Sequence, residues 1–279
     1  GQEDPVDVIH VFGGSAWTFA LEVATALGVP IALDVWRAGI ISRAASIHQP
    51  MPALFAPDER MGELIRTTNP EAQVRVTPWG VHVPGDDRTI LRRNVSPAIV
   101  IGGSGRDKQA FHQVAEALAL IIRSHPDVVV FFDAAAAHRS GIWKAAKESG
   151  ILDHISLIDE LEVHRELVLR ADLLLFPEAT GEHRTLLLDA MAHQMVIVAA
   201  ADDAQGALRD ETACIIRDAV PTAWSSAIRE LLEHPERARA IGASARSFIK
   251  DHHRGSAHVA SVLDAYEWMT SSDSVPFDQ

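Results

Sequence analysis

The strongest constraint on the fold of this chain lies in residues 171–200, ADLLLFPEATGEHRTLLLDAMAHQMVIVAA. An apolar run at 173–176 ends at Pro177, a polar loop follows, and a helix-like segment at 185–193 leads into a second apolar run at 196–200. This order of strand, loop, helix and strand is the unit that builds a parallel sheet covered by helices. Ligands of such sheets bind beyond the carboxyl ends of the strands, where these loops emerge.

The loop and the helix start carry an unusual number of charged side chains. One interpretation is a ligand site, and the other is that carboxylates stabilise the positive end of the helix dipole. The spacing alone leaves both open. The side chains concerned are Glu178, Glu182, His183, Arg184 and, one turn inside the helix, Asp189.

The same alternation of apolar runs and helix-like segments continues through the chain and predicts an α/β protein with two Rossmann-like, doubly wound parallel-sheet domains. The first half offers four strand candidates, whereas a complete nucleotide-binding domain has about six. We therefore expect the first domain to be truncated at its N-terminus. The expected strands are 7–12, 31–36, 53–58 and 74–79 in the first half, and 98–101, 128–133, 154–159, 171–176, 196–200 and 213–217 in the second.

Turn-forming residues set the expected domain boundaries. The stretch PGDDRTILRRNVS is polar and rich in turn formers, so a linker is predicted there. Helices are expected at 107–123, 140–149, 161–170, 221–233, 235–251 and 256–270, and fraying at 271–279. The predicted units are a partial N-terminal domain at 1–84, a linker at 85–96, a C-terminal domain at 97–255, and a C-terminal helix and tail at 256–279.

Composition excludes several classes of function. The chain has 25 Lys and Arg against 38 Asp and Glu, a formal net charge of −13, which disfavours nucleic-acid binding but allows a local positive pocket for one phosphate group. The one cysteine, Cys214, lies in an apolar run and is predicted to be a buried thiol. No run approaches the ~20 apolar residues of a transmembrane helix, and residues 1–10 are not a signal peptide. The sequence predicts a soluble, cytoplasmic protein.

A Gly-rich turn, GGSGRDK, follows the strand expected at 98–101 and precedes a helix. Turns in this position cradle phosphates with main-chain N–H groups and the helix dipole. It lacks the Gly-Lys-Ser/Thr of a P-loop, and a plain tight turn with solvated charges is the alternative. The predicted ligand-binding residues are Gly102, Gly103, Ser104 and Gly105, with Arg106 and Lys108 to neutralise a diphosphate.

Other chemistries lack their sequence patterns. The 14 histidines include no His-x-x-x-His pair and no His-Glu-x-x-His, so no metal site is predicted. There is no Gly-x-Ser-x-Gly elbow of an α/β hydrolase and no Gly-x-Gly-x-x-Gly after a strand, which disfavours nicotinamide or flavin chemistry.

Several phrases of the sequence resemble the GT-B retaining glycosyltransferases of family 4, the glycosyl transferases group 1. DVIHVFGG and GVPIALDV resemble strands of the family's first domain, and VRVTPWGVHVP resembles the segment that leads into the second. IGGSGRDK resembles the family's phosphate turn, and FPEATGEHRTLLLDAMAHQMVIVAA its signature loop and helix. The resemblance covers about residues 7–270 and is more specific in the second half.

The resemblance implies transfer of a sugar from a UDP- or GDP-sugar to a glycan, lipid or small-molecule acceptor, with no metal and no tightly bound cofactor. Lys108 and Arg106 would stabilise the leaving diphosphate, and Asp189 would bind the ribose. The donor sugar would be bound by Glu182, His183 and the backbone of the loop, which includes Arg184 and Thr185. The catalytic residues that the resemblance implies are Lys108, Arg106 and Glu182.

The chain departs from the family pattern at several polar positions. The second glutamate of the signature falls on Asp189, and the first falls on Gly181, with Glu182 displaced by one position. The family's phosphate arginine falls on Gly103, with Arg106 as local substitute, and its first-domain histidine falls on Trp36. The glycines after the second strand of the donor domain are replaced by the residues Asp133, Ala134 and Ala135.

These departures leave two classes of function open. The chain is either a divergent glycosyltransferase or a non-catalytic glycosyltransferase-like subunit that binds a partner protein or a nucleotide without turnover. In the second case a partner protein or a second copy would pair with the truncated first domain. An epimerase or phosphorylase is disfavoured, because neither suitably placed acids nor a pyridoxal lysine are evident.

Overall fold

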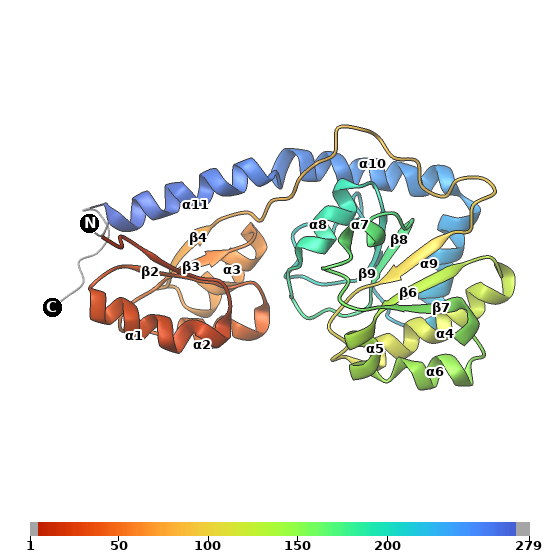
Figure 1. Cartoon of the computed structure of the whole chain (residues 1–279), viewed down its shortest axis with the longest axis horizontal. Coiled ribbons are helices and arrows are strands. Elements are labelled where there is room, and N and C mark those ends of the chain that lie inside the picture. The colour runs from red at the N-terminus through yellow and green to blue at the C-terminus, as the bar shows by residue number, and fades with distance from the viewer. Residues whose placement is uncertain (1–4, 272–279) are drawn as a thin grey trace.

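The computed structural model describes residues 5–271 and contains two parallel-sheet α/β domains side by side (Figure 1). All strand pairs in both sheets are parallel. The first sheet has the order β1-β2-β3-β4. Its strands are β1 (Ile9–Val11), β2 (Ile31–Asp34), β3 (Ala53–Ala56) and β4 (Gln73–Val76). The fold class predicted from the sequence is confirmed. The fraying expected at 271–279 concerns residues that, apart from Ser271, lie outside the described range.

The second sheet is doubly wound, in the order β10-β9-β8-β5-β6-β7. The chain runs outward from β5 to β6 and β7, and then crosses back to build β8, β9 and β10 on the other side of β5. The boundary between β5 and β8 is therefore the topological switch point, where ligands of such sheets bind. The strands are β5 (Ala98–Ile101), β6 (Val129–Asp133), β7 (Ile155–Ile158), β8 (Leu173–Phe176), β9 (Val196–Ala200) and β10 (Cys214–Ile216).

Helices cover both faces of the second sheet, which explains why its central strands are continuous apolar runs. Leu173, Leu174 and Leu175 are fully buried and point alternately into two apolar clusters, one on each face. The helices on one face are α4 (Lys108–Ser124), α5 (Ala134–Ser140), α6 (Ile142–Glu148) and α9 (Pro221–Glu233). On the other face lie α7 (Arg165–Val168), α8 (Thr185–Ala192) and the second half of α10 (Pro235–His252).

The first sheet is covered on one face by three helices that follow its strands, α1 (Trp17–Leu27), α2 (Ile41–Ala45) and α3 (Glu59–Thr68). Asp58 caps α3 by accepting a hydrogen bond of 2.8 Å from the N–H of Met61. Short 3₁₀ turns are at Gly14–Ala16, Ala38–Ile40 and Leu152–His154.

The last helix, α11 (Gly255–Thr270), returns to the first domain and packs on the opposite face of its sheet (Figure 1). Ala265 and Met269 belong to an apolar cluster with Phe55. The Tyr266 hydroxyl lies 2.6 Å from His10 Nδ1. The polypeptide therefore passes between the domains twice, once after β4 and once between α10 and α11. No helix of the described part is long and apolar enough to cross a membrane.

Three details of the local structure differ from the prediction. The helix expected at 140–149 is present as α6, and α5, which ends before Gly141 in a left-handed conformation, was not predicted. Asp133 caps α5 by accepting the N–H of Ala136 at 2.7 Å, so the residues interpreted as a substituted glycine turn begin a helix. The helix expected at 161–170 is limited to α7, and α2 was not predicted. The boundaries at 84, 97 and 256 stay predictions.

Candidate functional site

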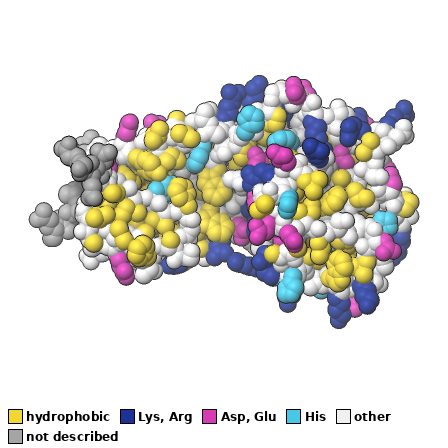
Figure 2. Space-filling model, in the orientation of Figure 1, with side chains coloured by type: hydrophobic (Ala, Val, Ile, Leu, Met, Phe, Trp, Pro, Cys, Tyr) yellow, Lys and Arg dark blue, Asp and Glu magenta, His cyan; other side chains and the backbone are white. Residues whose placement is uncertain are grey.

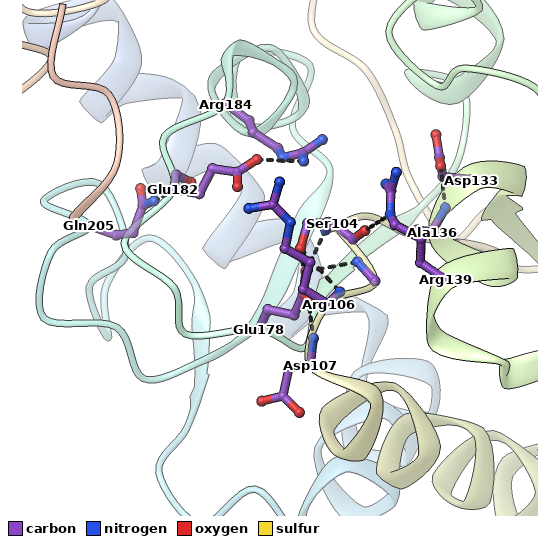
Figure 3. Close-up of polar contacts among 11 residues, drawn as sticks. Ser104, Arg106, Asp107, Asp133, Ala136, Arg139, Glu178, Glu182, Arg184 and Gln205 are labelled. Atoms are coloured by element: carbon purple, nitrogen blue, oxygen red, sulfur yellow. Dashed lines mark hydrogen bonds and ion pairs between the residues drawn. The ribbon is translucent and has the colours of Figure 1, made fainter. Parts of the chain in front are cut away.

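The candidate site lies at the carboxyl ends of three neighbouring strands, β5, β8 and β9, at the switch point of the second sheet. A Gly-rich turn follows β5 and the loop 177–184 follows β8 (Figure 3), and Asp202 follows β9. A small pocket between them contains four of the predicted residues, Gly103, Ser104, Glu182 and Arg184. Its remaining lining residues are Phe176, Glu178, Thr180, Leu187, Asp202, Gln205 and Leu208.

The main-chain N–H groups of the Gly-rich turn are bound to a carboxylate of the protein itself. Glu178, only 9% exposed, accepts hydrogen bonds from the N–H groups of Ser104, Gly105 (3.2 Å) and Asp107 (2.8 Å) (Figure 3). The Ser104 hydroxyl donates to the same carboxylate at 3.0 Å. Such charge-assisted bonds are the strong class of hydrogen bond. The donors predicted to cradle a phosphate are thus occupied in this structure.

The two cationic side chains of the turn are exposed to solvent, whereas its N–H groups bind Glu178. Arg106 and Lys108 are exposed, and neither side chain has a hydrogen-bond or ion-pair partner among the described residues. Lys108 is the first residue of α4, which Asp107 caps by accepting the N–H of Ala110 at 3.0 Å. Arg139, from α5, donates to the carbonyl oxygen of Ser104 at 2.6 Å. Positive charge therefore lies on the solvent side of the turn and an internal carboxylate on the inner side.

The loop after β8 is fixed by its own polar contacts. Glu182 forms a 2.5 Å ion pair with Arg184, and its carbonyl oxygen accepts from Gln205 Nε2 at 2.6 Å. Asp202 accepts the N–H of Gly181 at 2.7 Å. The pocket thus contains the carboxylates of Glu178, Glu182 and Asp202 and a single cation, Arg184, so its local charge is negative.

Asp189 lies outside this pocket and is paired with a residue that the sequence did not single out. Arg165, from α7, forms an ion pair with Asp189, and another of its nitrogens donates to Thr185 Oγ1 at 2.9 Å. Asp189 is 6% exposed. Burial raises the pKa of its carboxyl group above the ordinary value, although the Arg165 charge and hydrogen bond act in the opposite direction.

His183 turns away from the predicted sugar position and contacts the first domain. Its main-chain N–H donates to the carbonyl oxygen of Trp36 at 2.8 Å, and its Nε2 lies 2.9 Å from Asp58 Oδ2. Asp58 also accepts the N–H of Gly206 at 2.8 Å. Burial would raise the pKa of Asp58. The hydrogen bond and charge of His183, together with the main-chain N–H groups of Met61 and Gly206, nevertheless hold this pKa below its ordinary value.

A glycine is required where the resemblance would place the first signature glutamate. Gly181 has φ +62°, and its carbonyl oxygen accepts the N–H of Ala38 at 3.1 Å. A Cβ at Gly181 would lie 2.6 Å from the Cβ of Ala38. The main chain of the loop therefore contacts the first domain directly, with no room for a larger side chain.

The predicted residues are thus only partly brought together. Gly102 and Gly105 belong to the turn without lining the pocket, Lys108 and Arg106 lie outside it, and Thr185 and Asp189 contact Arg165. The loop position of Glu178 was noted from the sequence, but no local pattern connects it with a turn 71 to 74 residues away. Among the described residues, no group of three His, Cys, Asp or Glu side chains could hold a metal ion.

Solved structures share this architecture at low sequence identity. A glycosyltransferase from Rickettsia africae superposes with a TM-score of 0.73 and 12% identity over 96% of this chain and 78% of that one. The Anabaena protein Alr3699/HepE, determined in complex with UDP, gives 0.75 and 12% over 94% and 79%. Sucrose-phosphate synthase from Thermosynechococcus elongatus gives 0.68 and 15% over 94% and 73%. The chain therefore has the fold of GT-B glycosyltransferases.

The sequence itself also matches a family. Residues 96–234 match the family described as glycosyl transferases group 1, and this segment contains the second sheet and the whole candidate site. No curated protein matches the chain. The family match and the fold together support a group 1 glycosyltransferase.

Proposed function

We propose that the chain transfers a sugar from a nucleotide-sugar to an acceptor, with retention of configuration as in family 4. The observation that carries this proposal is that the turn after β5 and the loop after β8 contact each other at the switch point of the domain that matches the family. The Anabaena neighbour was determined with UDP and with UDP-glucose, which favours a uridine donor, while a guanosine donor stays open.

In the proposed reaction the bond between the sugar C1 and the diphosphate oxygen breaks, the acceptor hydroxyl oxygen bonds to C1 on the same face, and the hydroxyl proton passes to the leaving diphosphate. The diphosphate gains negative charge as it leaves, and the unpaired side chains of Lys108 and Arg106 would stabilise it. Glu182 and the loop backbone would contact the sugar, and Asp189 the ribose. No metal ion and no tightly bound cofactor is required in this scheme. The acceptor would be a glycan, lipid or small molecule, encountered in the cytoplasm.

The direct test is calorimetric titration with UDP, GDP and ADP, each with and without Mg²⁺. One diphosphate should bind, and Lys108→Ala should weaken it ten-fold or more, about 1.4 kcal/mol. Lys144→Ala is a matched control, because Lys144 is exposed on α6 and, among the residues that the structure describes, pairs with Glu148 alone. Equal affinity in Lys108→Ala and the wild type would remove Lys108 from the site. Release of the diphosphate from UDP-glucose would then be measured to detect turnover.

A second candidate is a glycosyltransferase-like subunit that binds a partner or a nucleotide without turnover. Three observations favour it. Glu178 occupies the N–H groups of the turn after β5, carboxylates outnumber cations in the pocket, and the main chain of Gly181 is hydrogen-bonded to the first domain. In the described part, β1 pairs only with β2, and Phe12 beside it is 75% exposed. A partner protein or a second copy could pair with this edge. Failure of all three diphosphates to bind would favour this candidate, and light scattering would detect self-association.

A further inference from the structure

A cleft of about 920 Å³ lies away from the candidate donor site, between the segment after β4 and the helix α10. It shares no lining residue with the pocket at β5, β8 and β9. Its size is within the usual range of small-molecule sites. The lining residues are Val81, His82, Val83, Pro84, Gly85, Asp87, Gln194, Ala243, Arg246, Ser247, Lys250, Arg254, Gly255 and Ser256.

The cleft is built on the two chain segments that connect the domains. The N–H of Val81 donates to the carbonyl oxygen of His253 at 2.8 Å, and the N–H of Gly255 donates to that of Val81 at 3.0 Å. The main chains touch so closely that a Cβ at Gly80 would lie 2.3 Å from the carbonyl oxygen of Arg254. The two connections are therefore bonded to each other, and both line the cleft, which we call the hinge cleft.

Three cations line the cleft. Arg246 and Lys250 lie one helical turn apart on α10, and Arg254 is the extended residue between α10 and α11. Arg246 is already neutralised, because it pairs with Asp87, the one acidic lining residue, and donates to the carbonyl oxygen of Asp86 at 3.0 Å. Its contacts tie the linker to α10.

Lys250 and Arg254 have no ion-pair partner among the described residues, and His82 is exposed on the opposite wall. In the same view as Figure 1, Lys and Arg side chains gather at the upper edge, where α10 passes into α11 (Figure 2). The whole chain has a formal net charge of −13, so a cleft with two cations that lack an ion-pair partner contrasts with the overall charge of the protein.

The helix ends explain only part of this arrangement. Lys250 lies in the last turn of α10, where a cation is favourable, and Arg254 Nε donates to the carbonyl oxygen of Lys250 at 2.6 Å. However, Arg254 also precedes α11, whose first turn carries no acidic residue. A cation at the start of a helix is unfavourable. An anion bound beside Arg254 would relieve this effect.

We propose that this hinge cleft binds a phosphorylated small molecule, with its phosphate between Lys250 and Arg254 and His82 as a further donor. The phosphate is the expected group because it accepts several charge-assisted hydrogen bonds at once. Its binding would link the segment after β4 to the α10–α11 junction and so restrict movement of the domains. The proposal does not depend on the reaction proposed for the donor pocket.

Inorganic pyrophosphate is a suitable probe, titrated by calorimetry into the full chain. The wild type should bind it saturably within about 10 mM, and Lys250→Gln/Arg254→Gln should weaken it ten-fold or more. Arg92→Gln/Arg93→Gln is the matched control, since it removes two exposed charges from the linker outside the cleft. Lys108→Ala separates this cleft from the donor pocket and should leave the hinge binding intact.

Absence of saturable binding, or binding that the hinge variant retains or that Lys108→Ala abolishes, would overturn the proposal. Sedimentation with phosphatidic acid vesicles, compared with phosphatidylcholine vesicles, tests whether a lipid headgroup supplies the phosphate. Binding to the phosphatidic acid vesicles without binding of pyrophosphate would overturn the small-molecule proposal and indicate a lipid surface as the ligand. If the double variant unfolds, Lys250→Gln alone takes its place in the titration, because it preserves the hydrogen bond from Arg254 to the carbonyl oxygen of residue 250.

Discussion

Glu178 and Asp107, 71 residues apart, are joined by a 2.8 Å hydrogen bond from the main-chain N–H of Asp107 to the carboxylate of Glu178. The bond links the loop after β8 to the turn after β5, and the same carboxylate binds two further main-chain N–H groups of that turn. A protein carboxylate thus has the contacts that a bound phosphate would have in a Gly-rich turn. The contact decides how a diphosphate can approach the pocket.

Replacement of Glu178 by Ala should increase the affinity for a nucleoside diphosphate. The variant frees three N–H groups and the Ser104 hydroxyl and removes one negative charge from an acidic pocket. We expect UDP to bind at least ten-fold more tightly than to the wild type, about 1.4 kcal/mol, as measured by calorimetry. Without ligand the variant should lose about 1–3 kcal/mol of stability, because buried donors lose their partner.

Glu178→Gln is the control for this change. Glutamine keeps the size and one acceptor oxygen, so it should preserve most of the stability and gain less affinity than Glu178→Ala. Equal UDP affinity in the wild type and Glu178→Ala would show that the Gly-rich turn after β5 does not contact the bound nucleotide.

Substitution of Gly181 should loosen the contact between the domains. Gly181→Ala places a Cβ 2.6 Å from that of Ala38 at a residue with φ +62°. Both effects are unfavourable, and we expect a loss of about 1–3 kcal/mol in urea denaturation. Thr180→Ala, on the neighbouring exposed residue, is the control and should change the stability by less than about 0.5 kcal/mol. Unchanged stability of Gly181→Ala would mean that the loop does not rest on Ala38 in solution.

His253 should make the hinge sensitive to acid. Burial lowers the pKa of its imidazole below the ordinary value, more strongly than the Trp79 carbonyl, 2.7 Å from Nδ1, raises it. Because the unfolded state then binds the proton more readily, the stability is fully present above about pH 6.5 and falls as the pH decreases through that value. His253→Asn keeps a donor for the Trp79 carbonyl but cannot titrate. Its melting temperature should fall less than that of the wild type on acidification, and parallel curves would contradict this role.

Arg165 should stabilise the fold through Asp189. Arg165→Gln leaves a buried carboxylate without its charged partner, and we expect a loss of about 1–3 kcal/mol in urea denaturation. Arg165→Gln/Asp189→Asn removes both charges and should recover part of this loss, which a double-mutant cycle measures. Additive effects would show that the two side chains do not interact in solution.

The sequence by itself determined the class of fold and most of its elements. Continuous apolar runs such as 173–176 and 196–200 specify strands buried on both faces, and the helices between them specify a parallel sheet. The bounds of β5, β9 and α9 agree with the prediction, because apolar periodicity and a Pro at a helix start are local signals. The start of α5 was missed, since its cap Asp133 precedes a run of alanines without polar periodicity.

Only the tertiary structure decided what the polar residues do. Glu178, Arg165 and Asp58 acquire their roles from Asp107, Asp189 and His183, which are at least 24 residues away in sequence, on loops and helices that meet only in the folded chain. Spacing along a chain reports which face of an element a residue occupies, but not which distant donor lies opposite it. The sequence could therefore place charged residues at the carboxyl edge of the sheet, whereas packing determined that one of them binds the turn expected to bind phosphate.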